Sequence, residues 1–229
     1  MKKLLILLLL STSFSTFADD HIDSLVDGFC YESPKAQVRN GLYYLPNQQE
    51  PFTGDNLCVY KRNGQYHSKG KIEDGKKDGK WTIWFKNGQK RREENYKDGK
   101  IVGGININYY DNGQIQNENG YSGEEFNYSN LDGKQTWWYE NGQIESEGNY
   151  KDGKKDGRST SWYENGQKWV ERNFKDGKFD GKETYWNEDG QKWLEANYKD
   201  DKRDGKKTYW DENGQKWLEG NYKDGKRVD

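Results

Sequence analysis

Short runs of aromatic and β-branched residues alternate with turn signals along most of the chain. In residues 160–169, TSWYENGQKW, two such runs flank an Asn-Gly pair. This arrangement predicts a β-hairpin with a type I′ turn, because glycine tolerates the positive φ that a tight turn requires. No segment after residue 18 has a helical period of useful length. We therefore expect an all-β protein.

The hairpin signal recurs about seven times. Tandem repeats of this size stack so that each unit contacts mainly its neighbours. The sequence therefore predicts an elongated single-layer antiparallel β-meander of tandem 24-residue β-hairpins over residues 51–229, preceded by a capping segment at residues 19–50. The turn glycines are Gly64, Gly88, Gly113, Gly142, Gly166, Gly190 and Gly214, with spacings of 24, 25, 29, 24, 24 and 24.

A two-residue Asn-Gly turn fixes the register of each hairpin and places Thr opposite Glu and Trp opposite Trp. The glutamates then form a row along the sheet. This row fits either a cation-binding or ligand-binding strip or a solvated row neutralised by lysines, and the balanced charges favour the second. The predicted pairs are Thr82–Glu93, Thr136–Glu147, Thr160–Glu171, Thr184–Glu195, Thr208–Glu219, Trp162–Trp169, Trp186–Trp193 and Trp210–Trp217.

The first eighteen residues differ from everything that follows. Lys2 and Lys3 precede an apolar run from Leu4 to Leu10, and Ala18 closes a small-residue cleavage pattern. The apolar run is shorter than the about 20 residues that span a bilayer. This is the pattern of a secretory signal peptide. We predict that residues 1–18 are removed and that the protein is periplasmic or secreted.

The sequence contains two cysteines, Cys30 and Cys58. In the oxidising compartment that an exported protein reaches, two cysteines usually form a disulfide. We therefore predict a Cys30–Cys58 disulfide that stabilises the capping segment. Two free buried thiols are the alternative.

Composition narrows the classes of partner. The chain has 37 Lys and Arg against 39 Asp and Glu, a net charge of -2. Without a basic field we expect no nucleic-acid partner and no binding to membrane lipid. Charged residues at 33% would alone favour disorder, but 10 Trp, 17 Tyr and 8 Phe supply the apolar area for a folded array.

The sequence holds little material for a catalytic site. Its two histidines, His21 and His67, lie outside the regular array, so no Ser-His, Cys-His or zinc centre is indicated. A flat ribbon does not hold two carboxylates across a cleft, as a glycosidase requires. Linkers such as residues 150–157 alternate lysine with aspartate, unlike a calcium loop. We expect no enzyme activity, no cofactor and no metal.

Two kinds of binding module remain. The first is an exported, non-catalytic module that binds a protein partner of unknown identity through aromatic anchors. The alternative binds a cell-wall, carbohydrate or choline-type ligand through its repeated Trp and Tyr hairpins. The irregular segment at residues 122–131 favours the first, since insertions in repeat arrays often lie on the binding side. Edge-to-edge self-association is also open to an exposed strand. The candidate partner-binding residues are Phe126, Tyr128, Trp137 and Trp138.

The stretch YKDGKKDGRSTSWYENGQ at residues 150–167 resembles the MORN repeat in its aromatic residues and spaced glycines. The variant is most similar to the bacterial second class of MORN repeats (MORN_2), found in YwqK-family antitoxin-like proteins. The resemblance covers about residues 51–229 and implies an array of hairpins. It also implies an antitoxin-like, immunity-like or host-interaction role, which an exported protein would perform in the cell envelope or outside the cell. The matching positions are Tyr150, Gly153, Gly157, Trp162, Asn165 and Gly166.

Overall fold

The computed structural model describes the backbone of residues 30–229 and the side chains from residue 33 onward. The predicted signal peptide and residues 19–29 of the predicted capping segment lie outside the described residues. The described chain folds into strands and turns without a helix. The strands of the repeats and β1 form an 18-stranded sheet, and β2 and β3 form a separate two-stranded sheet.

Three short strands come before the repeats: β1 (Cys30–Ser33), β2 (Gln37–Arg39) and β3 (Leu42–Tyr44). Seven hairpins follow within the described residues, and they are numbered below in chain order. The strands of the first four hairpins are β4 (Gly54–Tyr60) and β5 (Tyr66–Glu73), β6 (Lys76–Trp84) and β7 (Lys90–Lys97), β8 (Lys100–Tyr109) and β9 (Ile115–Ser122), and β10 (Leu131–Trp138) and β11 (Ile144–Lys151).

The last three hairpins are more alike in sequence. In the sixth and seventh, the first strand is interrupted after two residues, so that two short strands share one partner. The strands are β12 (Lys154–Trp162) and β13 (Lys168–Lys175), β14 (Lys178–Phe179) with β15 (Gly181–Trp186) and β16 (Lys192–Lys199), and β17 (Lys202–Arg203) with β18 (Gly205–Trp210) and β19 (Lys216–Lys223), followed by β20 (Lys226–Arg227).

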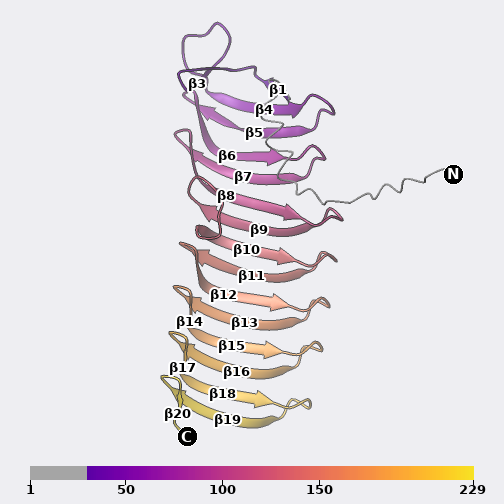
Figure 1. Cartoon of the computed structure of the whole chain (residues 1–229), viewed down its shortest axis with the longest axis vertical. Coiled ribbons are helices and arrows are strands. Elements are labelled where there is room, and N and C mark those ends of the chain that lie inside the picture. Colours follow the sequence, from indigo (N-terminus) through magenta and orange to yellow (C-terminus); the bar gives the residue numbers. More distant parts are fainter. Residues whose placement is uncertain (1–29) are drawn as a thin grey trace, which may run out of the picture.

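Strands that are neighbours in sequence are neighbours in the sheet. From β4 onward each strand pairs antiparallel with the next, where β14 with β15 and β17 with β18 each count as one interrupted strand. β1 pairs with the other side of β4. Figure 1 shows the hairpins stacked along the long axis of the molecule, from the first in indigo to the seventh in yellow. The predicted antiparallel β-meander of tandem hairpins is confirmed.

The Asn-Gly loops are wider than the sequence predicted. Tyr163 N donates to Gln167 O and Gly166 N donates to Tyr163 O, both at 2.9 Å. Gly166 has a φ of 83°, and Asn165 is not among the residues with positive φ. Asn165 Oδ1 instead accepts a hydrogen bond from Gln167 N at 2.9 Å, which holds a three-residue loop that ends in a glycine bulge. The predicted type I′ turn at Asn-Gly is therefore wrong.

Type I′ turns occur instead at the other ends of the strands, where one hairpin is connected to the next. This row of connecting turns is called the Asp-Gly edge below. Asp152 and Gly153 have φ values of 49° and 74°, and the flanking Lys151 and Lys154 pair with each other. Both central residues of this turn type need positive φ, and Asp-Gly satisfies the requirement. The same conformation recurs at Asp74-Gly75, Asp98-Gly99, Asp176-Gly177 and Asp224-Gly225.

The wider loop changes which residues face each other next to it. Trp162 lies opposite Lys168, and the next pair is Ser161 with Val170. Trp169 lies between these two pairs as a bulge residue, with no residue opposite it. The sixth and seventh hairpins do the same, because Trp186 faces Lys192 and Trp210 faces Lys216. The predicted Trp–Trp pairs are therefore wrong.

Beyond the bulge, the pairing follows the sequence prediction again. The loop takes one residue more than predicted from the first strand, and the bulge takes one residue from the second strand, so the register is restored. Every predicted Thr–Glu pair is confirmed. The pairs are Thr82–Glu93, Thr136–Glu147, Thr160–Glu171, Thr184–Glu195 and Thr208–Glu219.

Buried side chains are thinly spread along the sheet and are largest near its N-terminal end. Ile72 and Trp81 are 0% and 3% exposed, and the Trp81 indole donates to Lys71 O at 3.0 Å. The indole lies directly over Gly70, where a Cβ would come within 2.2 Å of the ring. Glycine at this position therefore makes room for the largest buried side chain of the first two hairpins.

The segment before the array docks on its edge. Tyr43 N donates to Gly75 O at 2.9 Å, and Gly75 N donates to Phe52 O at 2.9 Å. Along the other side of the first hairpin, β1 and β4 pair with Glu32 opposite Cys58. The two cysteine-bearing strands thus lie side by side, Cys58 is 4% exposed, and no cysteine within the described residues is free. The pairing of Cys30 with Cys58 stays a prediction.

Candidate functional site

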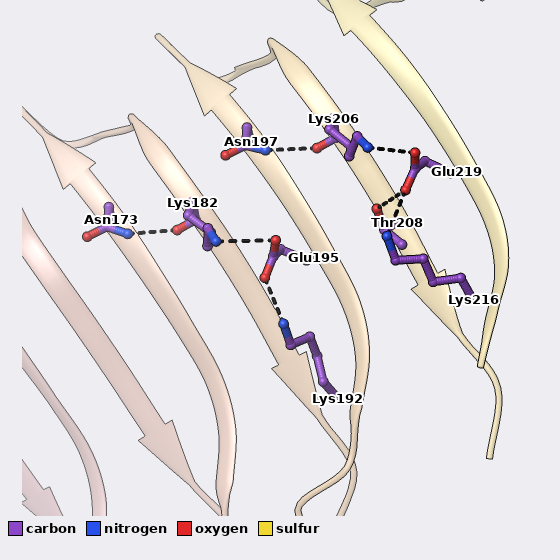
Figure 2. Close-up of polar contacts among 9 residues, drawn as sticks. All are labelled: Asn173, Lys182, Lys192, Glu195, Asn197, Lys206, Thr208, Lys216 and Glu219. Atoms are coloured by element: carbon purple, nitrogen blue, oxygen red, sulfur yellow. Dashed lines mark hydrogen bonds and ion pairs between the residues drawn. The ribbon is translucent and has the colours of Figure 1, made fainter. Parts of the chain in front are cut away.

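The glutamate row on one face of the sheet is paired with lysines. Glu195 contacts Lys182 Nζ at 3.2 Å and Lys192 Nζ at 2.9 Å. One repeat later, Glu219 contacts Lys206 Nζ at 2.6 Å and Lys216 Nζ at 3.4 Å, as Figure 2 shows. The row is thus neutralised by its neighbours, in agreement with the favoured interpretation of the sequence, and the carboxylates do not form a vacant cation-binding strip.

The same cluster is most enclosed in the second hairpin. The Glu93 side chain is 11% exposed and contacts Lys80 Nζ at 2.6 Å and Lys90 Nζ at 2.7 Å. Burial alone would raise the pKa of Glu93, but the hydrogen bonds from Lys80 and Lys90 outweigh burial and lower the pKa. Glu93 is therefore held in its charged form and strengthens the array.

The candidate residues of the inserted loop lie together. Phe126 contacts the ring of Tyr121 at 5.7 Å and the ring of Tyr128 at 5.5 Å, both edge to face, and Tyr128 is 64% exposed. The loop is held by Asn130, whose Nδ2 donates to Ser122 O at 2.6 Å and to Glu125 O at 2.7 Å. The loop thus holds the exposed Tyr128 against the half-buried Phe126.

Trp137 and Trp138 do not join this aromatic pair. They occupy consecutive positions at the far end of β10, so their side chains point to opposite faces of the sheet. The length of β10 separates them from the inserted loop by about 20 Å, at a rise of about 3.3 Å per residue. The four predicted residues therefore do not form a single surface.

An open cleft lies between the inserted loop and the segment before the array. Its volume is about 660 Å³, and it runs along the edge of the sheet that carries the Asp-Gly turns. In Figure 1, β3 and the connection from β9 to β10 lie along this same edge. The residues lining the cleft include Tyr43, Lys77, Tyr96, Lys100, Glu124 and Glu125.

The cleft combines both signs of charge with fixed aromatic rings. Lys77 Nζ lies 4.3 Å from the ring centre of Trp81 and 4.9 Å from that of Tyr96. The Tyr96 hydroxyl donates to Glu94 Oε2 at 2.8 Å. Burial, followed by this hydrogen bond, raises the pKa of Tyr96, so the phenol stays protonated. These contacts hold the Tyr96 ring in place, and the lining of the cleft also carries Glu124 and Glu125.

Sequence reasoning pointed to one wall of this cleft and missed the other. The insertion at residues 122–131 was visible as a break in the period. Tyr43 and Tyr96 gave no comparable signal, because their proximity depends on the docking of β3 against the turn at Gly75. The position of the cleft is a tertiary property that the repeat pattern does not encode.

Residues 30–229 contain neither a cluster of metal ligands nor a helix that could span a membrane. No group of three or more His, Cys, Asp or Glu side chains there is placed to hold a metal ion. In the same part of the chain, no helix has the length and hydropathy needed to cross a bilayer.

The family comparison agrees with the geometry of the hairpins. The family model described as "MORN repeat variant" matches residues 77–98, 131–152, 155–176, 179–200 and 203–224. The chain carries MORN repeats. Each matched segment covers one hairpin, from the turn that precedes it to the turn that follows it. The last four segments begin 24 residues apart. The third hairpin, with its altered sequence, lies between two matched segments.

No curated protein matches the chain. Among solved structures, a chain of the TcdB2-TccC3-Cdc42 complex is similar, with 11% identity and a TM-score of 0.33. The similarity covers 81% of this chain and 12% of that one. This chain therefore spans only a small part of the length of that protein.

Proposed function

We propose that this MORN-repeat protein is an exported, non-catalytic module that binds another protein through the cleft at the Asp-Gly edge. MORN repeats are in general modules for protein or membrane interaction. The observation that carries the proposal is that the two segments which depart from the repeat, β2–β3 and the inserted loop, bracket one cleft of about 660 Å³. Binding sites in repeat proteins often lie on the face where insertions occur.

The charges of the cleft favour a protein over a membrane surface. Lys77 and Lys100 line the cleft together with Glu124 and Glu125, so the cleft has no single-sign field to attract anionic lipid. Tyr43 and Tyr96 line the cleft, and Tyr128 is exposed on the inserted loop that forms one of its walls. Aromatic side chains of this kind are the anchors that dominate protein interfaces. A polypeptide with both charges and an apolar side chain is the complementary partner.

The place of action follows from the predicted signal peptide. An exported module meets its partner in the periplasm or outside the cell. A bacterial antitoxin-like protein in this setting would act as an immunity protein of the envelope, and a host protein is the corresponding partner outside the cell. These roles are finer forms of the same proposal.

Affinity capture with matched variants tests the proposal. The protein is incubated with envelope and culture-medium fractions beside a variant that lacks residues 124–128 and a control, Trp217→Ala, at the far end of the array. The same three proteins are applied to a glycan array that includes choline-bearing glycans. Circular dichroism verifies that the sheet is retained in each.

We expect one protein to be captured by the wild type and by Trp217→Ala, and lost from the folded loop deletion. Equal capture by the folded deletion would refute the cleft as the site. Glycan or choline binding that Trp217→Ala weakens, without capture of a protein, would replace the proposal with the alternative, which uses the exposed bulge residues Trp169, Trp193 and Trp217.

A further inference from the structure

In four of the six intervals between successive hairpin loops of the described residues, two hydrogen bonds tie one loop to the next. In the fifth hairpin the Tyr163 hydroxyl donates to Trp186 O at 2.9 Å, and Asn165 Nδ2 donates to Glu188 O at 2.8 Å. The bonds recur elsewhere as Tyr60 to Trp84, Tyr110 to Trp138 and Tyr139 to Trp162, and as Asn63 to Lys86, Asn112 to Glu140 and Asn141 to Glu164. The second loop instead has Phe85, and Gln89 Nε2 reaches the third loop by donating to Gly113 O at 2.6 Å.

Both bonds are absent between the sixth and seventh hairpins, which lie within the described residues. The sixth loop has Asn187 where the fifth has Tyr163, and Asp189 where the fifth has Asn165. Asn187 Oδ1 turns back to accept Gln191 N at 2.8 Å, and a carboxylate such as Asp189 has no hydrogen to donate. The sequence change therefore removes a phenol ring and two donors from one interval of the edge.

A cavity of about 380 Å³ opens at this interval. It is lined by Asn187, Trp193, Trp210, Asp211, Glu212 and Asn213. Two of these, Trp210 and Glu212, are the residues whose carbonyls would accept the missing bonds if the pattern of the preceding interval continued. The lining thus combines two indoles with carbonyl acceptors and the carboxylates of Glu212 and Asp211. Asp211 Oδ1 already accepts from Asn213 N at 3.0 Å and from Gln215 N at 2.8 Å, so Glu212 is the main carboxylate acceptor.

The indoles are held in place by neighbouring groups. Trp193 is 38% exposed and rests against Tyr185 with ring centres 5.3 Å apart. Lys192 Nζ lies 4.8 Å from the ring centre of Trp210, and its charge is matched by Glu195 at 2.9 Å. The nearby cation is therefore neutralised, while the charges of Asp211 and Glu212 leave the cavity itself acidic.

We propose that this cavity is a second binding site, which takes the guanidinium group of an arginine side chain in a peptide. A guanidinium is flat enough to stack on an indole, and its N–H groups only donate, so it suits a site rich in acceptors. It supplies the donors and the planar group that the tyrosine and the asparagine provide in the preceding interval. A choline head group has no N–H to donate, and a neutral sugar carries no positive charge to match the carboxylates of Asp211 and Glu212.

Titration of indole N–H signals by nuclear magnetic resonance tests the site. The probe is the tripeptide acetyl-Gly-Arg-Gly-amide, and its comparators are the citrulline and lysine tripeptides, free arginine, choline and N-acetylglucosamine. We expect the arginine peptide to shift the Trp193 and Trp210 signals saturably. The citrulline peptide, which is uncharged, should bind at least tenfold more weakly.

The matched variant restores the fifth loop by the double substitution Asn187→Tyr and Asp189→Asn. It should remove arginine binding while the urea midpoint stays equal or rises, which separates loss of the cavity from unfolding. Glu212→Gln, at an exposed turn position, should weaken binding at least threefold and covers the case in which the double variant does not fold. This site is separate from the Asp-Gly cleft, so its test is independent of the proposed function.

Equal binding of the citrulline and arginine peptides would overturn the guanidinium proposal, and so would undiminished binding to the folded double variant. Tighter binding of free arginine than of the peptide would exclude a protein as its source. Shifts caused by N-acetylglucosamine or choline, but not by arginine, would assign the cavity to a different ligand.

Discussion

The N-terminal part of the sheet, β4 to β11, and the C-terminal part, β12 to β19, share one repeat but differ in how the units are held together. In the first part, Ile72, Trp81 and Ile107 are buried. In the second, the bulge residues Trp169, Trp193 and Trp217 are 44%, 38% and 62% exposed. Val170, Leu194 and Ala196 are buried in the second part as well. The same hairpin therefore supports a part that buries a tryptophan and a part that displays tryptophans at its bulges, and a few substitutions per unit decide between them.

The largest expected contrast is between two tryptophans. Trp81→Ala removes a side chain that is 3% exposed and should cost about 3–5 kcal/mol of unfolding free energy. Trp193→Ala, at a half-exposed position, should cost about 1 kcal/mol from its lost ring contact. Urea unfolding followed by far-ultraviolet circular dichroism measures both. Equal costs would abolish the distinction between the two parts.

A second comparison places the residues of the sixth loop, which lacks the two inter-loop hydrogen bonds, in the N-terminal part of the sheet. The double substitution Tyr139→Asn and Asn141→Asp gives the fourth loop the residues of the sixth and removes two hydrogen bonds. Each bond contributes about 1 kcal/mol, so we expect a loss of about 2 kcal/mol or more with the ring included. Tyr139→Phe, which keeps the ring, should lose about half as much. If Tyr139→Phe loses no stability while the double variant does, the stability comes from the ring, and the hydrogen bond of the Tyr139 hydroxyl is incidental.

Two type I′ turns give a third contrast. At Gly177, φ is 85° and a Cβ would make only ordinary contact with Lys154, so Gly177→Ala should cost about 1 kcal/mol for backbone strain. At Gly153 a Cβ would lie 2.2 Å from Ser129 O of the inserted loop. Gly153→Ala should therefore cost about 1–3 kcal/mol more, because the loop must move. The urea midpoints of the two variants measure this difference in stability. Equal shifts of the midpoint would mean that the inserted loop moves away from a Cβ at residue 153 at little energetic cost.

The smallest contrast concerns the glutamate row. The pKa of Glu93 is lowered in the folded protein, so its contribution is complete above the ordinary glutamate pKa of 4.5 and is lost as pH falls through the folded value. Glu93→Gln should cost about 1 kcal/mol at pH 7, since its lysine partners are partly exposed, and this cost should shrink as pH falls below 4.5. The more exposed Glu219→Gln should show a smaller version of this difference. A cost for Glu93→Gln that does not change with pH would contradict the ion-pair explanation.

Local signals in the sequence predicted the hairpins, their period and the Thr–Glu register. They did not distinguish the two turn types, because Asn-Gly and Asp-Gly both supply glycine, and the deciding hydrogen bond, from Gln167 N to Asn165 Oδ1, lies inside the loop. The Trp–Trp pairs failed for this reason. Phe126 and Tyr128 do lie together, whereas the cleft beside them depends on the docking of Tyr43 against Gly75, which no local pattern specifies.

The extra residue of the wide loop is offset by the bulge residue, Trp169 in the fifth hairpin, so each 24-residue repeat keeps its own register. Equivalent residues of successive repeats therefore lie on the same face of the sheet. Duplication or loss of a whole repeat would lengthen or shorten the protein without moving any later side chain to the opposite face. A single inserted residue within a strand, by contrast, would invert everything up to the next irregularity.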